Sequence, residues 1–202
     1  MKKLIWITIF AVAFGLVEAV VVIYLRIHFY PEGFHFPLKI IPTRILYIEV
    51  VREVATVVML VAIGIMIGRT RLAKFGAFMV SFGMWDIFYY FWLYVLIDWP
   101  KSILDWDVLF LIPIPWIGPV LAPLLVSLGL TGCGMWIFLQ EERGVQLRTT
   151  PLDWIVEFSA TALMISTFFM NRGMETPVFL WWLFLVGLIG GIGYFLWRIF
   201  HL

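Results

Sequence analysis

Two acids and one base lie in the first turns of a segment that is long and apolar enough to cross a membrane. The segment is YIEVVREVATVVMLVAIGIMIG, residues 47–68, and its charged residues are Glu49, Arg52 and Glu53. A charge at the centre of a bilayer costs about 2.5–3.5 kcal/mol, so such residues usually face a bundle interior and pair with one another. Glu49 and Glu53 are four residues apart and share a helix face, and Arg52 follows Glu49 by three residues, which allows a pair.

Two further acids, Glu18 and Asp86, lie in other apolar segments of the chain. At a rise of 1.5 Å per residue, all four carboxylates fall within roughly 8–17 Å of the same membrane boundary. The sequence therefore predicts one buried polar site made by Glu18, Glu49, Arg52, Glu53 and Asp86. The alternative is a salt-bridged helix start near the lipid headgroups, with the other two acids hydrogen-bonded to Tyr or Trp of neighbouring helices.

The chemistry that these residues could carry is the binding or relay of a cation or a proton. Four carboxylates and one arginine cannot all be charged in a low dielectric without a compensating cation. Carboxylates suit hard cations, so a divalent metal ion held by Glu18, Glu49, Glu53 and Asp86 is one candidate. The predicted spans contain no histidine, which argues against haem or copper.

Four residues in the connections on the same side form the predicted mouth of the site. They are Asp105, Asp107, His28 and His35. The two histidines belong to the loop HFYPEGFHFPL, where histidines are more often solvent-exposed than ligands. The tryptophan-rich sequence around the two aspartates is also typical of an aromatic belt at the headgroup level.

Composition places the chain in a membrane. Of 202 residues, 63% are hydrophobic and only 13% are charged, whereas about a quarter of an ordinary soluble domain is charged. The apolar surplus must face lipid, so the bilayer is the first expected partner. A net charge of +1 argues against a nucleic-acid partner, and the single Cys133 excludes an internal disulfide.

Hydropathy predicts an all-α integral membrane protein with one domain, residues 1–202, built as a bundle of six transmembrane helices. The first apolar run is long enough to be a retained span rather than a cleaved signal peptide. The predicted spans lie near 4–27, 44–67, 75–97, 116–139, 152–170 and 178–200.

Two helix-start patterns refine this outline. Thr150, Pro151 and Asp153 form a capping box with proline at the first helical position, which predicts the start of the fifth span. Ser102 and Asp105 resemble a second box, which predicts a short helix near 103–112, before a proline-rich turn and the fourth span. Whether this segment is interfacial or re-entrant stays open.

Lysine and arginine predict the orientation, because cytoplasmic loops carry an excess of them. If the N-terminus is inside, eight lie on the cytoplasmic side and five on the other, which predicts that both termini are cytoplasmic. The eight are Lys2, Lys3, Arg69, Arg71, Lys74, Arg143, Arg148 and Arg198, and the five are Arg26, Lys39, Arg44, Lys101 and Arg172.

Small residues recur at a spacing of four, as in Gly64 with Gly68 and Gly187 with Gly191. In lipid, such pairs let helix backbones approach closely. We expect ordinary helix packing at these positions.

Several long motifs resemble a family of uncharacterised bacterial multi-span membrane proteins. They are VEAVVVIYLR, REVATVVML, WDIFYYFWLYVLIDWP and LDWDVLFLIPIPWIGPVLAP, and the resemblance covers roughly residues 14–130. It implies a location in the bacterial inner membrane. It implies no established activity, so no catalytic residue or cofactor is carried over.

Three functions follow as hypotheses. The first is a protein whose buried carboxylates bind or relay a cation or a proton. The second is a non-catalytic anchoring subunit of a larger membrane complex, of which an electron-transfer complex is one example. The third is a membrane enzyme acting on a lipid-soluble substrate, although no nucleophile–base motif or metal-ligand spacing commits the chain to such chemistry.

Overall fold

In the computed structural model, six helices are long and apolar enough to cross a membrane, and each corresponds to one of the six predicted spans. The structure describes residues 2–35, 39, 41–170 and 178–200, so Arg172 lies outside the described part. The helices are α1 (Lys2–Phe29), α2 (Thr43–Ile67), α3 (Arg71–Ile97), α4 (Leu121–Glu142), α5 (Pro151–Phe169) and α6 (Trp181–Phe200).

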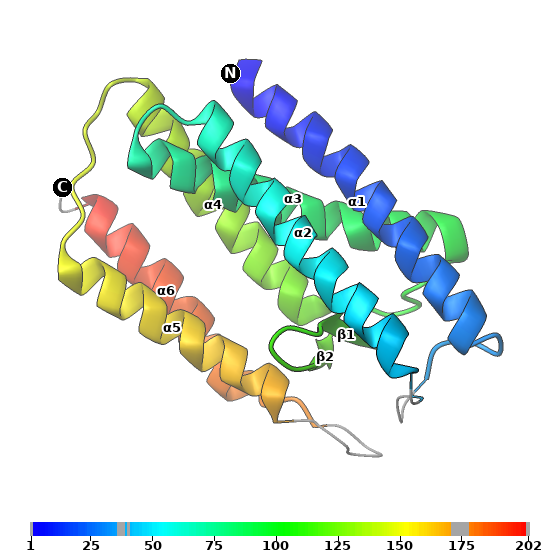
Figure 1. Cartoon of the computed structure of the whole chain (residues 1–202). Coiled ribbons are helices and arrows are strands. Elements are labelled where there is room, and N and C mark those ends of the chain that lie inside the picture. The colour runs from blue at the N-terminus through cyan, green and yellow to red at the C-terminus, as the bar shows by residue number, and fades with distance from the viewer. Residues whose placement is uncertain (1, 36–38, 40, 171–177, 201–202) are drawn as a thin grey trace.

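Consecutive helices run in opposite directions, and α3 lies at the centre of the first four (Figure 1). It packs against α1, α2 and α4, whereas α5 packs mainly against α6. The predicted start of α5 is confirmed: the Thr150 side chain accepts a hydrogen bond from the Asp153 amide, and Asp153 accepts one from the Thr150 amide.

The short helix predicted near 103–112 is wrong. Residues Trp106–Phe110 form strand β1 instead, which pairs antiparallel with β2 (Trp116–Pro119), and α4 begins at Leu121 rather than near Trp116. Residues that precede proline avoid the helical region, and this segment contains Pro113 and Pro115. The Asp105 carboxylate accepts hydrogen bonds from the amides of Lys101 and Ser102, so it closes a turn instead of capping a helix.

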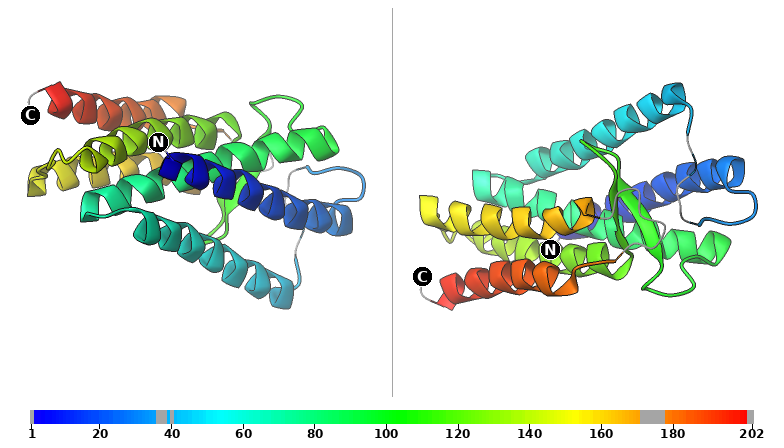
Figure 2. Two further views of the ribbon diagram at one scale, coloured as in Figure 1. Left: turned by 90° about the horizontal axis from the view of Figure 1, so that it is seen from above. Right: turned by 90° about the horizontal axis from the view of Figure 1, so that it is seen from below.

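The β-hairpin lies across the helices rather than along them, on the side where α1 ends and α2 begins (Figure 2). We call this side of the bundle the hairpin end and the other side the opposite end. Strand residues Ile117, Gly118 and Pro119 are buried, and Phe168 of α5 lies against Gly118. Non-helical backbone is tolerated at membrane depth only where protein covers it or where it lines a water-filled cavity, and strand β2 has such a protein cover.

At the opposite end, Lys3 joins three helices. Its ammonium group donates to the carbonyl oxygen of Ile67 at 3.1 Å and forms an ion pair with Glu142 at 2.8 Å. Beneath it lies an apolar cluster formed by α1, α3 and α4: Ile7, Ala73, Ala77, Val80 and Phe138.

Glycines set the closest helix contacts. A Cβ atom at Gly134 of α4 would lie 2.8 Å from the carbonyl oxygen of Gly76 on α3, and the reverse distance is the same. A Cβ atom at Gly187 of α6 would lie 2.8 Å from the carbonyl oxygen of Ala160 on α5. Ordinary close packing, as expected, explains these small residues.

We expect Gly134→Val to destabilise the bundle by about 1–3 kcal/mol, because the new side chain must push two helix backbones apart. Reversible unfolding in mixed micelles measures this change. Gly132→Val is the matched control, because nothing lies within 4 Å of a Cβ atom at Gly132. Equal stability of the two variants would contradict the close contact.

Candidate functional site

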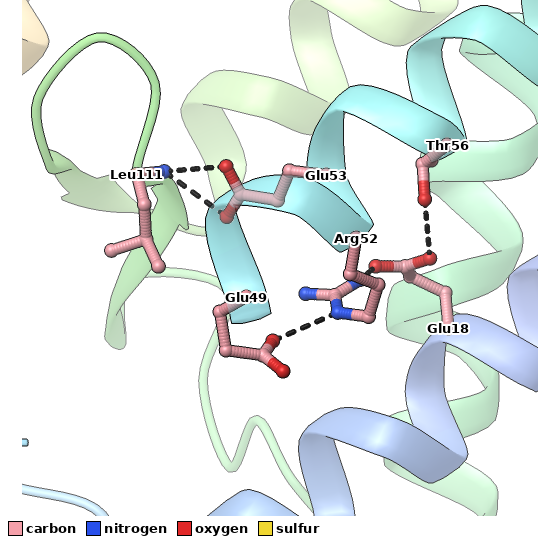
Figure 3. A network of polar contacts seen from close by, with 6 residues as sticks. All are labelled: Glu18, Glu49, Arg52, Glu53, Thr56 and Leu111. Atoms are coloured by element: carbon pink, nitrogen blue, oxygen red, sulfur yellow. Dashed lines mark hydrogen bonds and ion pairs between the residues drawn. The ribbon is translucent and has the colours of Figure 1, made fainter. Parts of the chain in front are cut away.

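Arg52 of α2 binds two buried carboxylates. Its Nε atom donates to Glu49 at 2.8 Å, and its Nη1 atom forms an ion pair with Glu18 of α1 (Figure 3). Glu18 also accepts a hydrogen bond from the Thr56 hydroxyl at 3.1 Å. Glu18 and Glu49 are buried, at 7% and 6% exposure, so both depend on Arg52 for charge compensation.

Glu53 connects α2 to the β-hairpin. The amide of Leu111, directly after β1, donates to both carboxylate oxygens of Glu53 at 2.8 and 3.1 Å (Figure 3). Glu53 lies about 15 Å along the helix axis from Thr43, so it holds the hairpin turn well away from the level at which α2 begins. The side chain thus satisfies a peptide group that has no helical partner.

Asp86 of α3 faces α4. The Ser127 hydroxyl donates to its Oδ2 atom at 2.8 Å, and both side chains are buried. Gly83, one turn before Asp86, allows the approach, since a Cβ atom there would lie 2.5 Å from the Ser127 carbonyl oxygen.

These groups meet around one small cavity of about 50 Å³. The structure therefore brings together the acids Glu18, Glu53 and Asp86 with Arg52, as the sequence predicts. Glu49 pairs with Arg52 but does not line the cavity. The polar residues that line the cavity are Glu18, Arg52, Glu53, Thr56, Asp86, Tyr89 and Tyr90. Residues 108–110 of β1 close one wall.

Asp107 is not at a mouth, contrary to its predicted place. It is 3% exposed and accepts hydrogen bonds from Arg26 at 2.9 Å and from the Tyr90 hydroxyl at 3.3 Å. The Arg26 guanidinium lies over Trp99, 3.6 Å from the ring centroid. Burial raises the pKa of Asp107 above its ordinary value, and the charge of Arg26 acts in the opposite direction.

The other predicted mouth residues do not line the cavity either. Asp105 holds the turn before β1. His28, in the last turn of α1, and His35, in the following loop, are exposed and make ring contacts with Phe29 and Tyr30. Neither contact directs an imidazole toward the carboxylates.

The geometry does not favour the predicted metal site. Within the described residues, no group of three or more His, Cys, Asp or Glu side chains is arranged to hold a metal ion. Glu18 is engaged by Arg52, Glu53 by the Leu111 amide and Asp86 by Ser127. These donors occupy oxygen atoms that a divalent cation would need as ligands.

Sequence reasoning missed several partners. Thr56 could have been found, because it follows Arg52 by four residues and so lies on the same helix face. Ser127, the Leu111 amide and the Arg26–Asp107 pair depend on contacts between distant segments, and no local spacing signals them.

We expect Arg52→Leu to lower the stability by about 3–5 kcal/mol, because it leaves two buried carboxylates without a counter-charge. Unfolding in mixed micelles measures the loss. The triple variant Glu18→Gln, Glu49→Gln, Arg52→Leu should recover a large part of it, since no buried charge is then left unpaired. Arg44→Leu is the control, because Arg44 is exposed at the start of α2. Failure of the triple variant to recover stability would argue against the ion-pair explanation.

We expect Glu53→Ala to release the hairpin turn. Hydrogen exchange at the Leu111 amide should rise by about tenfold or more, because the amide loses the side chain that accepts its hydrogen bond. Exchange measured by mass spectrometry over residues 106–119 checks this. Glu32→Ala, in the exposed loop after α1, should leave the exchange unchanged. Equal protection in Glu53→Ala would show that the strands alone hold the turn.

The chain matches no protein-family model, no curated protein and no solved structure. Its function has therefore to be inferred from the geometry and charge of the described residues. Those residues place three carboxyl groups and one guanidinium around a cavity that α1, α2, α3 and the β-hairpin enclose.

Proposed function

We propose that this chain is a membrane protein whose buried polar site binds protons and exchanges them from the hairpin end of the bundle. The observation that carries the proposal is the cavity lined by Glu18, Glu53 and Asp86 with Arg52 as the one basic residue among the described lining. This proposal is the first of the three hypotheses from the sequence, in which the buried carboxylates bind a cation or a proton. The geometry favours a proton over a metal ion as the bound species.

The charges around Arg52 do not balance unless protons or a cation are bound. Arg52 offers one positive charge to Glu18 and Glu49, whereas Glu53 has a peptide N–H and Asp86 a hydroxyl as hydrogen-bond donor. Four ionised carboxylates around one guanidinium would leave a large negative charge in a low dielectric. Protons or a bound cation must remove the excess.

The size of the cavity favours protons. A water molecule needs roughly 10–15 Å³ by the same kind of volume, so about 50 Å³ accommodates a few water molecules between the carboxyl groups. Such waters would pass protons between Glu18, Glu53 and Asp86. Tyr89 and Tyr90 line the same cavity, so their hydroxyls would join the hydrogen-bonded path between the carboxyl groups.

The apolar packing beyond the site supports exchange on one side only. The cluster of Ile7, Val80, Phe138 and their neighbours fills the space between α1, α3 and α4 toward the opposite end. A proton path through the bundle would have to cross that cluster. The proposal is therefore a binding and exchange site rather than a channel.

The orientation that we propose has both termini in the cytoplasm of a bacterium and the hairpin end facing outward across the inner membrane. The lysine and arginine count supports it. In this orientation eight basic residues lie on the cytoplasmic side and five on the outer side, and acidic residues have little influence on orientation.

Infrared spectroscopy of the protein in lipid nanodiscs tests the proposal. We expect a protonated-carboxyl band at neutral pH that shifts in deuterated water, because the excess carboxylates carry protons. Glu53→Gln and Asp86→Asn should each remove part of the band while keeping a hydrogen-bond acceptor in place. Glu32→Gln, which changes an exposed acid, should leave the band intact.

A different infrared result would contradict proton binding. If all carboxyl groups are ionised at neutral pH and the spectrum changes on addition of Na⁺ or Ca²⁺, the site holds a metal cation instead. The same variants would then abolish the cation-dependent change.

A further inference from the structure

A second and larger cavity lies away from the polar site, between the α3–α4 pair and the α5–α6 pair. Its volume is about 250 Å³. Its four helices are membrane-spanning candidates, and residues 147–149 of the α4–α5 connection line one end. An occupant that enters between the helices must be soluble in lipid. None of the residues around Arg52 lines it.

Two pairs of aromatic rings lie among the aliphatic side chains that line this cavity. Phe75 of α3 and Trp154 of α5 form an edge-to-face pair at 5.4 Å, and Trp136 of α4 and Phe195 of α6 form another at 5.6 Å. Aromatic rings prefer offset or edge-to-face contacts with other rings. The cavity is therefore suited to a flat, ring-containing ligand.

One carboxyl group in the lining lacks a donor. The Oε1 atom of Glu157 is enclosed and has no hydrogen-bond partner among the described residues. Its other oxygen lies toward α6, where a Cβ atom at Gly191 would be 3.3 Å from it. A buried acceptor is normally paired, so this one calls for an explanation.

The neighbouring acid in α5, unlike Glu157, has several hydrogen-bond donors. Asp153, one helical turn earlier in α5, accepts hydrogen bonds from the Tyr194 hydroxyl at 2.7 Å, from Arg198 at 3.0 Å and from the Thr150 amide. Arg198, one basic residue of the lining, is thus engaged by Asp153, and the other, Arg148, donates no hydrogen bond to Oε1 of Glu157. A ligand that enters the cavity can supply the missing donor.

We propose that this cavity binds a lipid-soluble phenol or hydroquinone whose hydroxyl group donates a hydrogen bond to Oε1 of Glu157, with the ring and tail against the aromatic and aliphatic walls. An anionic lipid headgroup does not fit beside a carboxylate. A neutral ring with a hydroxyl group meets both the apolar walls and the unpaired acceptor.

The test compares three ligands that carry the same dodecyl tail. Dodecylhydroquinone can donate to Glu157, its dimethyl ether has nearly the same shape but no donor, and dodecylammonium is a cation. Binding to the full chain in nanodiscs is measured by native mass spectrometry and by quenching of tryptophan fluorescence. We expect saturable binding of the hydroquinone, about tenfold or more tighter than that of the ether.

Variants separate the two parts of the site. Glu157→Leu should remove the preference for the hydroquinone over the ether, because the acceptor is lost. Gly129→Leu should weaken both ligands, because it fills the space between α4 and Ile192 of α6. Ser159→Leu, at an exposed position of α5 that does not line the cavity, should change neither.

Three results would overturn the proposal. They are equal binding of hydroquinone and ether in the wild type, binding that survives Gly129→Leu, and preferred binding of dodecylammonium, which would make the cavity a cation site. If Glu157→Leu does not fold, the comparison of the three ligands on the wild type still decides. The polar site around Arg52 is unaffected by either outcome.

Discussion

The bundle depends on one guanidinium between two helices that otherwise make little contact. Arg52 of α2 reaches Glu18 of α1, and the two helices do not pack closely along their lengths. Hydrophobic burial cannot supply this attraction within lipid, where the tails are as apolar as the side chains. Both helices pack against α3, so polar pairing decides how α1 and α2 lie relative to each other around Arg52, and it also gathers the carboxylates that the proposed function requires.

Much of the site could be predicted from spacing and depth. Glu18, Glu53 and Asp86 lie in separate apolar segments, and the constant rise of a helix per residue places them at similar depths. The cost of a charge in lipid then favours side chains that face the bundle interior and meet there. The pair of Glu49 and Arg52 follows from a three-residue spacing. The six spans follow from the need of a backbone in lipid to satisfy its own hydrogen bonds.

The hairpin could not be predicted in the same way. Ser102 and Asp105 have the spacing of a helix cap, and the same two residues close a turn when the chain that follows pairs with residues 116–119. Strand pairing is a contact between separate segments, and proline signals only that a helix is disfavoured. For that reason the sequence alone predicts Asp107 at the mouth of the site, whereas strand β1 places it against Arg26 in the interior.

The hairpin also touches both sides of the gap between α1 and α2. Asp107 on strand β1 holds Arg26 near the end of α1, and the Leu111 amide beyond that strand holds Glu53 of α2. The contacts of α3 with its neighbours are set by glycines and rigid backbone. The connection between α1 and α2, by contrast, consists of ion pairs and a few hydrogen bonds. Packed interfaces have few alternative arrangements. The attraction between ionised side chains, by contrast, changes whenever one of them gains or loses a proton. Any motion linked to the charge state of the bundle would therefore begin as a change in the distance between α1 and α2. The hairpin would move with it, because it is bonded to both helices.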